Sequence, residues 1–115
     1  MIKKLMQHIE DNVPELQGKI EANIVSKETN PPCCRYFTKG GDIGSLGGYV
    51  GQIEEVQLDI FSKSYTELKA ILYKVKKALY SFDYLPERLT YEDNFDEETQ
   101  WHREIITFQI KFKEY

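Results

Sequence analysis

The sequence predicts an α+β domain in which a mostly antiparallel sheet of four or five strands carries two helices packed on one face. Two observations predict this class. Between Glu54 and Leu79 the apolar spacing changes from the two residues of a strand to the three or four of a helix. Near the end of the chain, residues 106–113 alternate between apolar and polar side chains, which is typical of a half-buried strand.

The size and composition of the chain indicate one globular domain spanning residues 1–115. The residues are 41% hydrophobic and 30% charged, so the chain can bury a core without disulfide staples. No apolar run reaches the roughly 20 residues of a membrane-spanning helix, and residues 1–10 lack the pattern of a signal peptide. We therefore expect a cytoplasmic protein with no membrane partner. The net charge of −4 does not favour nucleic-acid binding by general electrostatics.

The first third of the chain predicts one helix and two strands. Apolar residues recur at helical spacing over residues 2–13, and Pro14 disfavours continuation of the helix. Residues 20–24 alternate as a first strand, and a turn-rich stretch separates them from a second strand at 33–39. Because Cys33 and Cys34 are adjacent, an ordinary disulfide between them is disfavoured, and we expect reduced thiols at the start of this strand.

Six of the seven glycines then fall within twelve residues, a density that weakens both helix and strand through backbone entropy. We expect a mobile loop at about 40–51. The segment lacks the Gly-Lys-Ser/Thr and Gly-x-Gly-x-x-Gly patterns of phosphate-binding loops. It is either a flexible surface loop or an assembly loop that orders when it meets a partner. The assembly-loop residues would be Gly40, Gly41, Asp42, Gly44, Gly47, Gly48 and Gly51.

The second helix has a start signal in the sequence. Ser64 followed by Glu67 predicts a capping box, and an apolar stripe then runs from Leu68 to Leu79. A further strand is predicted at 88–92. It leads into an acidic segment that we expect at a solvated hairpin tip, because crowded like charges repel. The residues of the acidic segment are Glu92, Asp93, Asp96, Glu97 and Glu98.

Motifs for chemistry are scarce, and we predict no catalytic, cofactor or metal site. His8, Cys33, Cys34 and His102 do not have the spacing of a zinc site. The acidic segment does not fit the EF-hand template, since Phe95 occupies a ligand position. His102 lies near acidic residues, but an unaccompanied histidine is usually structural.

One surface feature offers two interpretations. Four residues form a stripe beside the apolar face of the second helix, which we call the basic tyrosine stripe: Lys69, Tyr73, Lys76 and Tyr80. The favoured interpretation is an ordinary solvated face on which lysine stems cover tyrosine rings. The alternative is a subunit or partner interface, because tyrosine is enriched where proteins meet.

The order of these segments resembles the tail-completion proteins of long-tailed phages, also called tail-terminator or tail-to-head joining proteins. The strand 56–64 ends in Phe61 and Ser62 and opens the long helix, as is typical of that family. Residues 88–95 and 101–112 lie where the family has its closing hairpin. The early strand departs from the family pattern, because residues 33–36 replace its usual apolar and aromatic run.

The resemblance implies a homo-oligomer, a six-membered ring that caps the tail tube and offers a docking surface to the head connector. It implies no enzyme activity and no cofactor, and it places the protein in a virion tail assembled in the host cytoplasm and encoded by a phage or prophage. We add the hypothesis that the basic tyrosine stripe of one subunit faces the acidic segment of the next, closing a ring. Alternatively, the acidic segment lines the channel of the ring and repels passing DNA.

Two other classes of function stay open. A small-molecule-binding or regulatory domain would have the same layers and a concave apolar pocket with a few convergent polar groups. A minor enzyme using His102 would require a carboxylate or hydroxyl partner around that ring in the fold.

Overall fold

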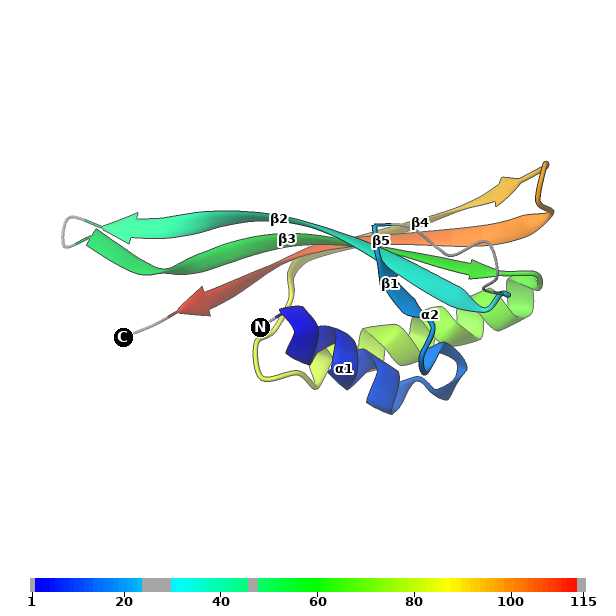
Figure 1. The fold of residues 1–115 in the computed structure, drawn as a ribbon, viewed down its shortest axis with the longest axis horizontal. Helices are drawn as coiled ribbons and strands as arrows, with labels where there is room; N and C mark the ends of the chain where they lie inside the picture. Colours follow the sequence, from blue (N-terminus) through cyan, green and yellow to red (C-terminus); the bar gives the residue numbers. More distant parts are fainter. Residues whose placement is uncertain (1, 24–29, 46–47, 114–115) are drawn as a thin grey trace.

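A computed structural model describes residues 2–23, 30–45 and 48–113, and it confirms the predicted α+β class. Both helices lie on one face of a five-stranded sheet (Figure 1). The strand order is β1-β2-β3-β5-β4; β1 runs parallel to β2, and every other neighbouring pair is antiparallel. The elements are α1 (Ile2–Asn12), the 3₁₀ turn η1 (Pro14–Leu16), β1 (Ile20–Ala22), β2 (Cys33–Ser45), β3 (Gly48–Ser62), α2 (Tyr65–Tyr80), β4 (Glu87–Asp96) and β5 (Trp101–Lys113).

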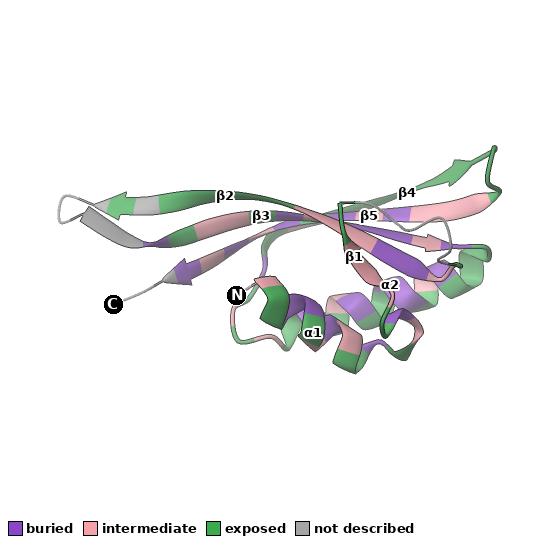
Figure 2. Cartoon of the chain, in the orientation of Figure 1, coloured by how far each residue is buried: buried purple, intermediate pink, exposed green. Residues whose placement is uncertain are grey.

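The core lies between the two helices and the face of the sheet beneath them (Figure 2). The period-two residues of β3 and β5 supply the sheet side, and the period-3.6 residues of α1 and α2 supply the helix side. The buried apolar side chains of β3 are Val56, Leu58 and Ile60, and those of β5 include Ile106, Phe108 and Ile110. The predicted helical stripe from Leu68 to Leu79 is also buried, as the sequence pattern requires.

The N-terminus of α2 is capped as predicted, with one addition. Ser64 Oγ accepts a hydrogen bond from the Glu67 amide at 3.3 Å. The Glu67 carboxylate does not reach back to the Ser64 amide directly. Instead Ser62 Oγ accepts from the Ser64 amide at 3.1 Å and donates to Glu67 Oε1 at 2.6 Å. The buried Ser62 hydroxyl therefore completes the capping box as a relay between strand and helix.

The prediction of a loop at about 40–51 is wrong for the residues that the structure describes, because these residues form strands. Residues 40–45 belong to β2 and 48–51 belong to β3, and the two stretches pair antiparallel with one register shift between Ile43 and Gly44. Pairing supplies each strand with hydrogen-bond partners along the hairpin, which offsets the entropic cost of the glycines. Gly47 lies outside the described residues. The mobility of the segment stays a prediction.

Several element boundaries differ from the predicted ones. β1 ends at Ala22, and Ile24, which was expected in the same strand, lies outside the described residues. β2 continues past residue 39, and β4 continues past residue 92 to Asp96. Most of the acidic segment is thus strand, with only its last two residues in the turn to β5. All residues from 91 to 100 are exposed, in agreement with the solvated position that we expected.

The two cysteines are free thiols at the start of β2, as predicted. Both are buried. Burial raises the pKa of Cys33 to about 11 and raises that of Cys34 further. These thiols therefore act as small apolar side chains.

The sheet is longer than the helical layer that covers it. The molecule measures 52 × 25 × 24 Å, and the β2–β3 hairpin extends past the ends of α1 and α2 (Figure 1). At the other end of the sheet the β4–β5 hairpin lies near the N-terminal end of α2 (Figure 1). Within the described residues, neither helix has the length and apolar character needed to span a membrane.

Candidate interaction surfaces

The basic tyrosine stripe lies on the outer side of α2. The side chains of Tyr73 and Tyr80 are 63% and 54% exposed. They line a shallow hollow of about 400 Å³ together with Lys76, Lys77 and Ser81. The Lys77 ammonium lies 5.2 Å from the centre of the Tyr73 ring, a cation–π contact within the helix, and the ordinary solvated face stays a prediction. Two large exposed rings on one helix face are also what a protein contact uses.

Lys69 differs from the rest of the stripe because it forms ion pairs with two carboxylates of its own chain. Its ammonium donates to Glu104 Oε1 at 2.6 Å and lies 3.1 Å from Asp93 Oδ2. The hydrogen bond to Glu104 is the main cause of the raised pKa of Lys69, and the same lysine lowers the pKa of Asp93. Lys69 and Asp93 thus join α2 to β4 within one chain, and a contact between subunits would have to use the other residues of the stripe.

Lys76 also faces β4. Its ammonium lies 4.3 Å from the centre of the Tyr91 ring, a cation–π contact between helix and hairpin. Tyr91, Asp93 and Phe95 project to the helix side of β4, where they are paired with Ile106, Glu104 and His102 of β5. Glu92 and Asp96 alternate with them and project to the opposite face. The acidic segment therefore divides between the two faces of the sheet.

His102 lies among aromatic side chains. Its ring centre is 4.8 Å from that of Phe95 and 5.7 Å from that of Tyr65. The described residues include no group of three or more His, Cys, Asp or Glu that could hold a metal ion. No carboxylate or hydroxyl among the described residues hydrogen-bonds to His102. The arrangement gives the enzyme interpretation no support.

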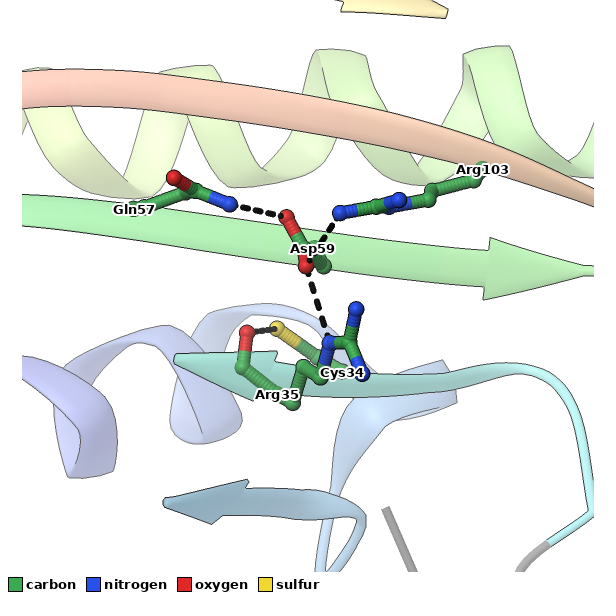
Figure 3. Close-up of polar contacts among 5 residues, drawn as sticks. All are labelled: Cys34, Arg35, Gln57, Asp59 and Arg103. Carbon is green, nitrogen blue, oxygen red and sulfur yellow. Dashed lines mark hydrogen bonds and ion pairs between the residues drawn. The ribbon is translucent and has the colours of Figure 1, made fainter. Parts of the chain in front are cut away.

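A polar cluster on the face of the sheet opposite the helices was not predicted. Asp59 of β3 has no exposed side-chain surface, and three side chains surround its carboxylate (Figure 3). Arg35 Nε and Arg103 Nη2 both lie 2.8 Å from Asp59 Oδ2, and Gln57 Nε2 donates to Oδ1 at 3.0 Å. We call these four residues the open-face cluster.

The strand register explains why the open-face cluster forms. Arg35 of β2 pairs directly with Asp59 of β3, and Arg103 of β5 pairs with Phe61, two residues along the same face. The Phe61 ring centre lies 5.3 Å from the Arg35 guanidinium and 5.9 Å from that of Arg103. This ring excludes water from one side of the ion pairs, so the Asp59 charge is buried with partners on both of its oxygens.

A hollow of about 620 Å³ adjoins the open-face cluster. It is lined by Arg35, Phe61, Asn94, Phe95, Asp96, Thr99, Trp101 and Arg103. The sequence carries one signal of this site. The largely polar face of β3 and β5 also carries Phe61, Trp101 and Ile105, and aromatic residues on a solvent face indicate a further packed or binding surface.

Comparisons with known proteins identify the fold. No protein-family model matches the chain, and no curated protein matches its sequence. Among solved structures, the chain is similar to one in the structure described as "Virion of native gene transfer agent (GTA) particle". The TM-score is 0.70 at 12% sequence identity, over 96% of this chain and 92% of that chain. The two chains therefore share a fold along nearly their whole lengths.

Proposed function

We propose that this chain is a structural protein of a phage-like virion, which forms a six-membered ring at the end of the tail tube and joins the tail to the head connector. The observation that carries the proposal is the fold shared with a chain of a gene transfer agent virion, over 96% of this chain. The tail-terminating position and the ring rest on the resemblance of the strand-to-helix segment 56–79 to tail-completion proteins. In this role the protein works by binding alone, with no reaction and no cofactor.

The surfaces of the chain fit a part that contacts several neighbours. The basic tyrosine stripe lies on α2, the acidic segment lies on β4 and the turn after it, and the β2–β3 hairpin extends to the far end of an elongated molecule (Figure 1). Different surfaces at different positions are what a head-to-tail ring requires, since each subunit must offer two unlike patches. Tyr73, Lys76 and Tyr80 form one patch; Glu92, Asp96, Glu97 and Glu98 form the other.

A direct test is negative-stain microscopy of the purified protein mixed with tail tubes. We expect a ring at one end of each tube, and tubes that stop growing once the ring is bound. The variant Tyr80→Asp should weaken ring formation, because it replaces an exposed ring of the proposed patch with a negative charge. Lys4→Glu is a control for added negative charge, since Lys4 is exposed on α1 and does not belong to that patch. Tubes with bare ends under saturating protein would contradict the proposal.

The electrostatic part of the proposal has its own test. Salt screens exposed charges over about 10 Å at 0.1 M and about 3 Å at 1 M, so a stripe-to-acid contact should loosen at high salt. Sedimentation at both salt concentrations would measure this. An unchanged assembly state would rule out electrostatic pairing as an important contribution. If Glu97→Gln with Glu98→Gln left the ring intact but blocked DNA passage, the acidic segment would instead line the channel.

A further inference from the structure

The open-face cluster carries more positive charge than its own carboxylate neutralises. Two guanidinium groups share one Asp59 oxygen, so three charged groups have a net charge of +1. The arginine side chains are 29% and 27% exposed, whereas Asp59 is fully buried. Asp96 also lines the hollow, but no ion pair joins it to either guanidinium within the described residues. The exposed charges of the open-face cluster therefore belong to the two guanidiniums, and the hollow beside them also holds the carboxylate of Asp96.

The arginines use little of their hydrogen-bonding capacity. Each guanidinium has five N–H donors, and among the described residues each makes one hydrogen bond, to the same Asp59 oxygen. Arg103 Nε is buried with no partner. Asp59 holds both guanidiniums in place beside Phe61, so their remaining donors are preorganised for a second acceptor.

Aromatic rings make the same hollow suited to a protein partner. Phe61 and Trp101 form an edge-to-face pair with ring centres 6.0 Å apart, and both residues line the hollow. Arginine and tryptophan are the residues that most often dominate the energy of protein interfaces. An occupant should therefore have one acceptor group with apolar surface on either side of it.

The acidic segment beside the hollow favours a ligand with a single carboxylate over a nucleic acid. Asp96 lines the hollow, and Glu97 and Glu98 follow directly in the turn. A phosphodiester backbone carries a charge at every nucleotide and would be repelled along this rim. A single carboxylate needs only the two guanidiniums, which match it in fork geometry.

We propose that the hollow beside Arg35 and Arg103 is a docking site for a partner protein, which inserts one aspartate or glutamate side chain between apolar neighbours. Asp59 is a positioning residue for this contact, because it fixes both guanidiniums and does not face the partner. The inference does not rest on the formation of a ring, and its test uses the full chain without tail tubes.

The test uses the single tryptophan of the chain as a reporter, since Trp101 lines the hollow. The ligand is a capped peptide with one glutamate flanked by phenylalanines, and the control peptide has glutamine in place of that glutamate. We expect the glutamate peptide to change Trp101 fluorescence saturably and to bind at least about tenfold more tightly, as a charge-assisted hydrogen bond would give. Oligothymidylate tests nucleic acid as the alternative occupant.

Variants assign the binding to the arginines. Arg35→Gln should weaken the glutamate peptide about tenfold, and Arg35→Lys should weaken it less, because it keeps the charge and loses the fork. Lys39→Gln is the matched control, since it removes one charge from the same face of β2 outside the hollow. If Arg35→Gln does not fold, the Nε–Hε resonances of both arginines in the unmodified chain should shift with the glutamate peptide alone.

Three results would overturn the inference. The first is equal binding of the glutamate and glutamine peptides, and the second is equal weakening by Arg35→Gln and Lys39→Gln. The third is tighter binding of oligothymidylate than of the glutamate peptide, which would assign the hollow to nucleic acid. A ring on tail tubes would be unaffected by any of these results, so the two proposals fail separately.

Discussion

Lys69 of α2 forms an ion pair with the buried carboxylate of Glu104 in β5, and the Lys69 Nζ lies 2.6 Å from Glu104 Oε1. Glu104 has no exposed surface, and its Oε2 has no hydrogen-bond partner among the described atoms. The carboxylate therefore depends on a single lysine. Asp93, whose side chain is partly exposed, forms a second ion pair with the same lysine.

Lys69→Met should lower the free energy of unfolding by about 3 kcal/mol, because it leaves the Glu104 charge buried without a partner. Urea denaturation followed by circular dichroism would measure the loss. Lys76→Met removes a lysine from the same helix without breaking an ion pair and should cost less than about 1 kcal/mol. Adding Glu104→Gln to Lys69→Met should recover part of the loss, and equal stability of the two lysine variants would contradict this account.

Ser62→Ala should destabilise the chain by about 1–2 kcal/mol, because it removes the relay and leaves the Ser64 amide and the Glu67 carboxylate unpaired there. Thr66→Ala serves as the control, since it truncates an exposed hydroxyl in the same first turn of α2. Thermal unfolding of the two variants would compare them. A loss no larger than that of the control would mean that water replaces the Ser62 hydroxyl.

Glu15 should make the stability of the chain depend on pH. Lys74 donates a hydrogen bond to Glu15 Oε2 at 2.7 Å, which lowers the pKa of Glu15 in the folded state. A lowered pKa contributes stability above the unfolded value, about 4.3, and that contribution is lost as the pH falls through the folded value. Glu15→Gln should therefore reduce stability at pH 7 and flatten its decline in acid. Glu10→Gln, measured in parallel, controls for the loss of one carboxylate.

Gly41 and Gly18 should respond in opposite directions to substitution. A Cβ at Gly41 meets no atom within 4 Å, so Gly41→Thr should stabilise the strand by about 0.5 kcal/mol. Gly18 has φ of +72°, so Gly18→Ala should cost about 1 kcal/mol although space is also open there. If the glycine-rich segment must bend during assembly, Gly41→Thr would raise stability and reduce ring formation in the same preparation.

The helices, the core and most strands followed from residue periodicity, because burial imposes a period of 3.6 on α2 and of 2 on β3 and β5. The β2–β3 hairpin could not be predicted in this way. Glycine propensity is a local property, whereas the pairing of residues 40–45 with 48–54 depends on register set further along the strands. The local glycine content therefore predicts a loop, whereas pairing between the two segments produces strands in the structure.

The candidate sites divide in the same manner. The basic tyrosine stripe could be predicted because its residues share one helix and helical spacing fixes their common face. The open-face cluster could not, since Arg35, Asp59 and Arg103 come from three strands and are brought together only by the sheet. The partners of Lys69 were missed for the same reason, as Glu104 is distant in sequence and adjacent only in the fold.

The overhang of the sheet beyond its helices gives β3 two kinds of support. Leu58 and Ile60 of β3 belong to the buried core, whereas Gln52 is exposed near the start of the strand, in the part of the β2–β3 hairpin that leads beyond the helices (Figure 1). Amide protons near Gln52 should therefore exchange with solvent long before those near Leu58, since opening the tip does not require the core to separate. β3 thus runs from a cooperatively folded core into a hairpin end that can open locally while the core stays folded.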